Sequence, residues 1–220
     1  MPDPTLEVRV KVCGIRRLED GLLAIAEGAW ALGFIFHPPS PRAITPAAAA
    51  ALLARLRRES GRAFLAVGVF VDLALGELQA IVEKVGLDVA QLHGDESPEY
   101  ASRVHAWEVW KALRVGESFD LTSLDPYRAV PRLLLDTHRD GVAGGTGEVF
   151  DWQFARSAAT QREIILAGGL RPANVAEAVR SVQPGAIDVS SGVEERPGVK
   201  DAEKLRALFR EVRGVARVAF

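Results

Sequence analysis

The chain has 220 residues, of which 48% are hydrophobic, as expected for one domain with a large core. Its formal net charge of −2 gives no broadly basic surface, so neither nucleic acid nor an anionic membrane is an expected partner. The single cysteine, Cys13, excludes an intramolecular disulfide and indicates a reducing compartment. With no signal-peptide pattern and no run of about 18 apolar residues, we expect a cytoplasmic protein.

Eight short segments rich in apolar residues predict β-strands, and most are bounded by Gly, Pro or Asp. In chain order they span residues 8–13, 30–36, 64–71, 88–92, 108–113, 131–136, 163–167 and 186–189. Apolar residues at helical spacing follow several of these strands, at residues 75–85, 175–182 and 205–212. Thr45-Pro46 and Ser97-Pro98 are typical helix starts, and Gly28, Gly61 and Gly86 stand where helices should end. Residues 114–128 show no clean helical face.

Alternating strands and helices fit either a closed parallel barrel or a doubly wound open sheet. Eight units in 220 residues favour the α/β class with a (β/α)8 fold, the TIM barrel. No linker or low-complexity tract interrupts the chain, so we expect a single domain over residues 1–220. In such a barrel, functional side chains lie at the C-terminal ends of the strands.

Two loops at neighbouring strand ends predict a phosphate site. Gly168-Gly169 follows the seventh predicted strand, and Ser190-Ser191-Gly192 follows the eighth. Glycine lets the backbone approach an anion closely, and N–H groups at a helix start can bind phosphate oxygens. Each loop alone would suit an ordinary turn, but the two together at these positions favour phosphate.

Cys13 ends the first predicted strand and is a candidate general base. Strand residues two apart share a face, so Lys11 should lie beside Cys13, where its ammonium would favour the thiolate. The competing interpretation is a small buried hydrophobic residue, which is the usual role of a lone cysteine.

Asp136 and Arg42 also follow predicted strands. Asp136 comes after the apolar run 133–135 and is a candidate acid or base, although a helix cap or a loop ion pair would suit it equally. The glycine-rich segment 141–147 behind it suits a loop that closes over a ligand. Arg42, in Ser40-Pro41-Arg42, could bind a carboxylate bidentately through its guanidinium, or could be a solvated surface arginine.

No metal or cofactor is expected. The four histidines, His37, His93, His105 and His138, show no metal-ligand spacing. The sequence contains neither a dinucleotide-binding fingerprint nor a P-loop.

Taken together, these segments resemble the phosphoribosylanthranilate isomerase family. The matching motifs run in family order across nearly the whole chain: Lys11-Val12-Cys13-Gly14-Ile15, Gly33-Phe34-Ile35-Phe36, Ser40-Pro41-Arg42, Val67-Gly68-Val69-Phe70, Gln91-Leu92-His93-Gly94-Asp95-Glu96, Leu135-Asp136, Gly144-Gly145-Thr146-Gly147, Phe150-Asp151-Trp152, Leu166-Ala167-Gly168-Gly169-Leu170, Asp188-Val189-Ser190-Ser191-Gly192-Val193-Glu194 and Pro197-Gly198 with Lys200-Asp201. His37-Pro38-Pro39 departs from the family's Tyr-Pro-Lys, and residues 115–130 match nothing in the pattern.

The resemblance implies an Amadori rearrangement of N-(5-phosphoribosyl)anthranilate, a step of tryptophan biosynthesis, with no cofactor. Asp136 would protonate the ring oxygen, Cys13 would remove the C2′ proton, and Arg42 would bind the anthranilate carboxylate. The phosphate would be bound by Gly168, Gly169, Ser190, Ser191 and Gly192. Supporting roles are implied for Lys11, Gln91, His93, Gly145 and Asp188. The partner is the small-molecule substrate, and the chain would be a monomer or a homodimer.

Related barrels give the alternatives. The sister isomerase of the histidine pathway uses two carboxylates, and Cys13 argues against it. Indoleglycerol-phosphate synthase would need a lysine acid and a longer N-terminal extension, and ribulose-phosphate epimerase a carboxylate pair. A non-catalytic phosphoribosyl-binding barrel would be expected to lose the acid or the base first, yet both Cys13 and Asp136 are present.

Overall fold

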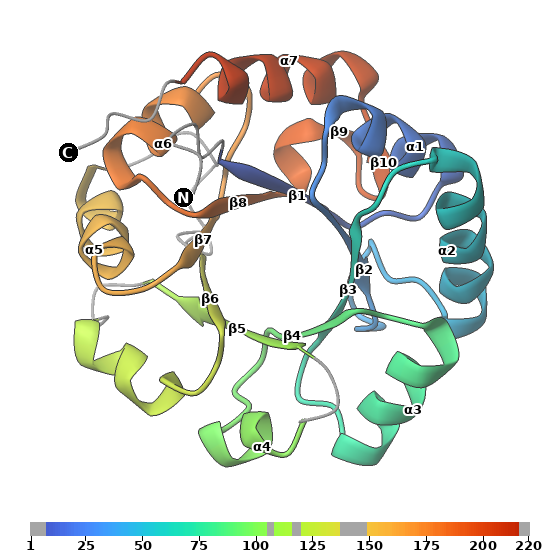
Figure 1. Ribbon diagram of the computed structural model, residues 1–220, viewed down its shortest axis with the longest axis horizontal. Helices are drawn as coiled ribbons and strands as arrows, with labels where there is room; N and C mark the ends of the chain where they lie inside the picture. Colours follow the sequence, from blue (N-terminus) through green and yellow to red (C-terminus); the bar gives the residue numbers. More distant parts are fainter. Residues whose placement is uncertain (1–7, 105–107, 116–119, 137–148, 216–220) are drawn as a thin grey trace.

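The computed structural model describes residues 8–104, 108–115, 120–136 and 149–215. Eight parallel strands pair in sequence order and close into a barrel, with the helices around its outside (Figure 1). The strands are β1 Arg9–Cys13, β2 Ala31–Ile35, β3 Leu65–Phe70, β4 Val89–Leu92, β5 Glu108–Arg114, β6 Arg132–Asp136, β7 Ile164–Ala167 and β8 Ala186–Val189. Pairing of β1 with β8 closes the sheet, which confirms the predicted barrel over the open sheet.

The helices follow the predicted pattern. They are α1 Leu18–Glu27, α2 Pro46–Ser60, α3 Leu75–Val85, α4 Pro98–Ser102, α5 Val149–Ala159, α6 Val175–Val182 and α7 Ala202–Arg213. The hydroxyls of Thr45 and Ser97 accept hydrogen bonds at the starts of α2 and α4. Gly28, Gly61 and Gly86 end α1, α2 and α3 in the left-handed conformation. Among the described residues, no helix is long and apolar enough to cross a membrane.

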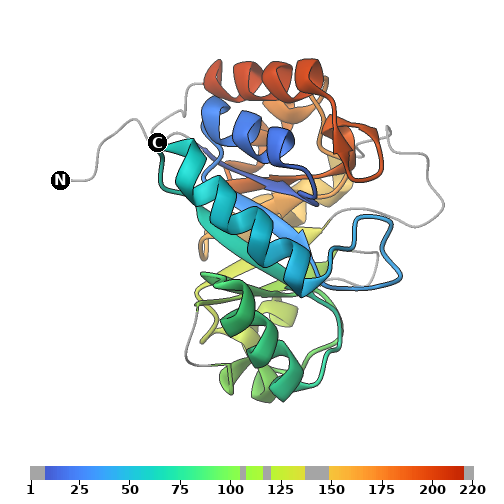
Figure 2. The same cartoon turned by 90° about the vertical axis from the view of Figure 1, so that its right-hand side faces the viewer.

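Two short 3₁₀ helices and a two-stranded hairpin were not predicted. Part of the connection without a helical face forms the 3₁₀ helix η1, Leu121–Tyr127, which contains Pro126. After β8, the 3₁₀ helix η2, Ser191–Val193, leads into a hairpin of β9 Glu194–Arg196 and β10 Val199–Lys200. The hairpin lies at the same end of the barrel as the loop after β2 (Figure 2).

The two ends of the barrel interior differ in chemistry. Apolar side chains such as Val67, Leu134 and Ile165 fill its lower layers. The N-terminal end is closed by Trp30 stacked on Trp110, with ring centroids 5.2 Å apart. Towards the C-terminal end the side chains of the interior become polar, with Lys11 and Gln91 almost fully buried. The N-terminal end therefore serves stability, and the candidate site lies at the C-terminal end.

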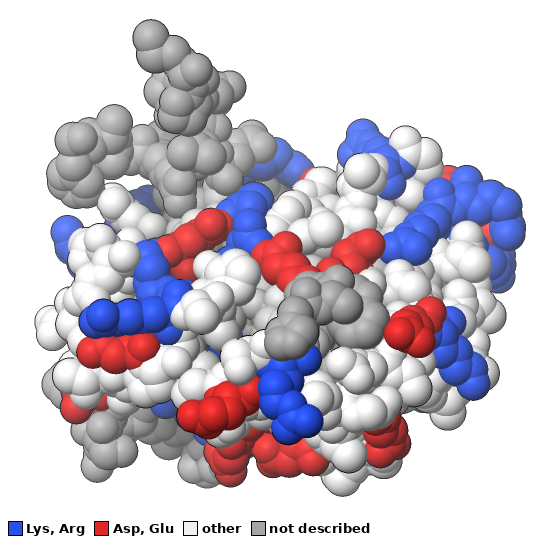
Figure 3. Space-filling model, turned by 60° about the horizontal axis from the view of Figure 1, so that its bottom comes forward, with Lys and Arg blue, Asp and Glu red and all other residues white. Residues whose placement is uncertain are grey.

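Charges are mixed on the outer surface. On the face shown in Figure 3, Lys and Arg side chains are interspersed with Asp and Glu. This distribution agrees with the net charge of −2 and does not concentrate positive potential on that face.

Candidate active site

Cys13 and Lys11 share the inner face of β1, because strand side chains alternate. Both are buried, and they lie against Gly33 on the neighbouring strand β2. A Cβ at position 33 would lie 2.7 Å from the Cys13 sulfur and 3.1 Å from Lys11 Nζ. Glycine at this position therefore makes room for the thiol and the ammonium together.

The Lys11 ammonium is paired with a second buried charge. Lys11 Nζ donates to Asp188 Oδ2 at 2.8 Å across the β1–β8 pairing. Burial alone would lower the pKa of Lys11, but Asp188 and Cys13 together raise it, so the side chain stays charged. Within the described residues, Asp188 Oδ1 is buried and has no hydrogen-bond partner.

Lys11 favours the Cys13 thiolate as expected, but burial opposes it. Burial raises the pKa of the Cys13 thiol, while the ammonium groups of Lys11 and Lys200 lower it. The burial effect is larger, so the net pKa is raised above that of an ordinary thiol. Lys11 thus offsets part of the cost of forming a buried thiolate.

Asp136 stands at the C-terminal end of β6, with His93 beside it. His93 Nε2 lies 3.5 Å from Asp136 Oδ2. The Gln91 amide nitrogen lies 2.9 Å from His93 Nδ1, a contact that suits the tautomer with its ring hydrogen on Nε2. Burial raises the pKa of Asp188 by more than the Lys11 ammonium lowers it.

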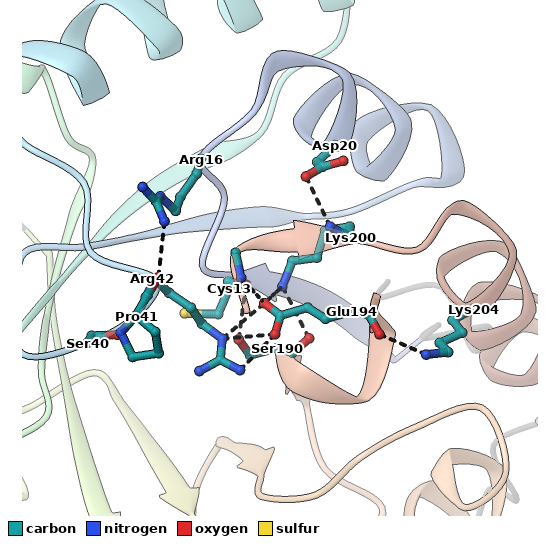
Figure 4. Close-up of polar contacts among 11 residues, drawn as sticks. Cys13, Arg16, Asp20, Ser40, Pro41, Arg42, Ser190, Glu194, Lys200 and Lys204 are labelled. Atoms are coloured by element: carbon teal, nitrogen blue, oxygen red, sulfur yellow. Dashed lines mark hydrogen bonds and ion pairs between the residues drawn. The ribbon is translucent and has the colours of Figure 1, made fainter. Parts of the chain in front are cut away.

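Arg42 is held by a carboxylate that the sequence analysis did not consider (Figure 4). Its Nε lies 3.0 Å from each Glu194 oxygen, and its Nη2 lies 2.7 Å from Oε2. Its side chain is 21% exposed, so Arg42 is not a freely solvated surface arginine. Glu194 begins β9, and its side chain is only 3% exposed. No strand periodicity in this stretch of sequence indicates that Glu194 is buried.

The loops after β7 and β8 lie against each other. Gly168 and Gly169 have φ values of 96° and 59°, a region that side chains disfavour. A Cβ at Gly192 would lie 1.9 Å from the Leu170 carbonyl oxygen, so the two loops are in contact at this point. Ser190 Oγ donates to the Cys13 carbonyl at 3.3 Å, which joins the β8 loop to the end of β1.

A second buried pair at the ends of β4 and β5 was also not predicted. Lys111 Nζ donates to Glu96 Oε2 at 3.0 Å and to the Gly94 carbonyl at 2.6 Å. Glu96 in turn accepts from the backbone N–H groups of Asp72 and Gly94. These contacts brace the loop that follows His93.

Some predicted residues lie outside the described part of the chain. Gly145, His105, His138 and the rest of the glycine-rich segment 141–147 fall there. Among the residues that are described, no group of three or more His, Cys, Asp or Glu side chains could hold a metal ion.

Comparison with known proteins adds an independent observation. The sequence pattern of the N-(5'phosphoribosyl)anthranilate (PRA) isomerase family matches residues 10–211. The chain belongs to this family. The N-(5'-phosphoribosyl)anthranilate isomerase of Citrifermentans bemidjiense is 48% identical over 96% of this chain and 99% of its own length. That of Nitrosococcus oceani is 46% identical over 96% of this chain and 100% of its own length.

Solved structures of the family have the same fold. Phosphoribosyl anthranilate isomerase from Thermus thermophilus is 44% identical with a TM-score of 0.82, covering 94% of this chain and 99% of that one. The enzyme from Thermotoga maritima is 38% identical with a TM-score of 0.85 over the same shares. A further family structure, 36% identical with a TM-score of 0.82 and again the same coverage, contains reduced 1-(o-carboxyphenylamino)-1-deoxyribulose 5-phosphate.

Proposed function

We propose that the chain catalyses the Amadori rearrangement of N-(5'-phosphoribosyl)anthranilate to 1-(2-carboxyphenylamino)-1-deoxyribulose 5-phosphate in tryptophan biosynthesis. Cys13 is the general base and Asp136 the general acid. The observation that carries these roles is the pair of reactive groups at one end of the barrel, on β1 and β6, with Lys11, Asp188 and His93 between them. Family membership supports the reaction itself.

The reaction needs one proton delivered and one removed. Asp136 donates its proton to the furanose ring oxygen, the bond from that oxygen to C1′ breaks, and an iminium forms between C1′ and the anthranilate nitrogen. The Cys13 thiolate then removes the C2′ proton, and the electron pair of that bond neutralises the iminium to give an enolamine. The enolamine becomes the ketone when C1′ gains a proton and the C2′ hydroxyl loses one. Every step is a proton transfer or the opening of the ring.

Substrate fluorescence offers the simplest test of the activity. Phosphoribosylanthranilate should lose its fluorescence on adding the purified enzyme, with no metal or cofactor supplied. A protein that binds the substrate yet leaves its fluorescence unchanged would be the non-catalytic barrel instead.

His93 holds the Asp136 carboxylate in this proposal. Its Nε2 lies 3.5 Å from Asp136 Oδ2, so an N–H on this nitrogen can stabilise the carboxylate once the proton has gone to the ring oxygen. We predict that His93→Asn lowers kcat on the order of tenfold, as loss of about 1.5 kcal/mol of charge-assisted bonding would do. Affinity for the reduced product should change little. A kcat equal to that of the wild type would remove His93 from the mechanism.

The phosphate of the substrate is assigned to the loops after β7 and β8. Gly168, Gly169, Ser190, Ser191 and Gly192 supply backbone N–H groups and hydroxyls there, and the close contact at Gly192 fixes the spacing of the loops.

We predict that Gly192→Ala weakens competitive inhibition by inorganic phosphate by about tenfold or more, equivalent to about 1.4 kcal/mol. The added methyl group cannot fit against the Leu170 carbonyl, so the loops must separate. Gly76→Ala is the matched control, because a Cβ at this position in α3 meets nothing within 4 Å. Equal phosphate inhibition in the two variants would place the anion elsewhere.

The cellular setting follows from the base. A free thiol that acts as a base must be protected from oxidation, so a reducing compartment, the cytoplasm, is proposed for the enzyme. Its partner is the small-molecule substrate, with neither nucleic acid nor membrane involved. A monomer or a homodimer, and one domain over residues 1–220, stay predictions.

A further inference from the structure

Glu194 is a buried carboxylate that contacts two cations at the mouth of the barrel (Figure 4). Besides its contacts to Arg42, its Oε1 accepts from Lys200 Nζ at 2.9 Å and from the Gly198 N–H at 3.2 Å. Burial alone would raise the pKa of Glu194, but Arg42 and Lys200 hold it below its usual value. Both carboxylate oxygens are therefore engaged, which makes Glu194 unsuited to exchange protons with a substrate.

The contact uses only one edge of the Arg42 guanidinium. A guanidinium carries five N–H donors in a planar fork, enough for two carboxylates on two different edges. Glu194 occupies the edge made by Nε and Nη2. Within the described part of the chain, no hydrogen bond from Nη1 is present, so the edge made by Nη1 and Nη2 can bind a second anion.

The charges in this cluster leave room for that second anion. Arg42 and Lys200 carry two positive charges against the one negative charge of Glu194. Lys200 is fixed as well, because its Nζ donates to the Ser190 carbonyl at 3.2 Å and its backbone N–H donates to Asp20 at 3.1 Å. The cluster thus ties the β2 loop that carries Arg42 to the β8 loop assigned to the phosphate.

We propose that Glu194 is a positioning residue for recognition of the substrate's carboxylate. Its hydrogen bonds to one edge of the Arg42 guanidinium orient the other edge towards the carboxylate on the anthranilate ring. The proposal rests on the proposed function and on the role that the family resemblance implies for Arg42, binding of the anthranilate carboxylate. Without Glu194, the arginine side chain would have to be ordered by the ligand itself, and that cost would appear as weaker binding.

The test compares two ligands on matched variants. One ligand is reduced 1-(o-carboxyphenylamino)-1-deoxyribulose 5-phosphate, and the other is the same compound without its ring carboxylate. The dissociation constant of the second ligand divided by that of the first measures recognition of the carboxylate alone. Glu194→Gln should reduce this ratio by about tenfold, or about 1.4 kcal/mol, through the affinity of the first ligand. It should raise KM with kcat little changed. The exposed neighbour provides the control variant, Glu195→Gln.

The sign of the effect separates positioning from simple charge balance. If Glu194 only offset positive charge, its removal would strengthen binding of the anionic ring carboxylate. A ratio that is unchanged or larger in Glu194→Gln therefore overturns the proposal. Because the single variant leaves Lys200 buried without its partner, the same comparison is made in Glu194→Gln/Lys200→Met, which has neither charge. A tenfold fall there supports positioning, and an unchanged ratio contradicts it.

Arg42→Gln separates the role of Arg42 in binding the carboxylate from the positioning role of Glu194. If this variant keeps the wild-type ratio, Arg42 does not bind the carboxylate, and the function proposed for it fails. If Arg42→Gln loses the ratio while both Glu194 variants keep it, Arg42 stands and only the positioning role of Glu194 fails.

Discussion

Asp136→Asn is expected to lower kcat by about 10²-fold or more, because an amide cannot deliver the proton that opens the furanose ring. The substitution keeps the shape of the side chain beside His93, so the reduced product should bind with nearly wild-type affinity. Steady-state kcat and the dissociation constant of the reduced product are the two measurements.

Asp125→Asn is the matched control for this variant. Asp125 is exposed on η1 and pairs only with Arg128 among the described residues, an interaction worth little in solvent. A kcat for Asp136→Asn as high as that of Asp125→Asn would show that another group protonates the ring oxygen.

Cys13→Ala is expected to lower kcat by about 10²–10⁴-fold, the usual contribution of a general base. Cys13→Ser should also be poor, because a hydroxyl ionises far less readily than a thiol in the same buried position. Both variants should still bind the reduced product, since Cys13 acts on the C2′ proton and contributes little to affinity. Near-normal turnover in either variant would identify a different base.

The raised pKa of Cys13 gives this prediction a second readout. Because the thiolate is the reactive form, alkylation of Cys13 and kcat/KM should both rise with pH through a range above that of an ordinary thiol. Only one cysteine is present, so the alkylation signal belongs to Cys13. If kcat/KM instead rises with pH in the acidic range, where the alkylation rate does not, the thiolate is not the base.

Local periodicity was sufficient to predict the barrel and the positions of Cys13 and Asp136 at its strand ends. Alternation along one strand placed Lys11 beside Cys13, and the end of an apolar run marked Asp136. These features depend on residues close in sequence, so they can be recognised before the fold is known.

The partners of these residues could not be predicted in the same way. Lys11 and Asp188 are 177 residues apart, and Arg42 and Glu194 are 152 apart, so only closure of the barrel brings them together. Glu194 lies on a hairpin strand of three residues, too short for any periodicity to appear. The net pKa of Cys13 was also inaccessible, because the nearby lysine could be recognised from spacing but the extent of burial could not.

Loss of the C2′ hydrogen is the step assigned to Cys13, and an isotopic label at that position follows it. With substrate that carries tritium at C2′, the wild-type enzyme should transfer the label to solvent or to C1′ of the product in step with turnover. Cys13→Ala is expected to transfer label about 10²–10⁴-fold more slowly than the wild type, in parallel with its kcat, although it still binds the reduced product. Label transfer by Cys13→Ala at the wild-type rate would contradict this assignment, because the base would then be another residue.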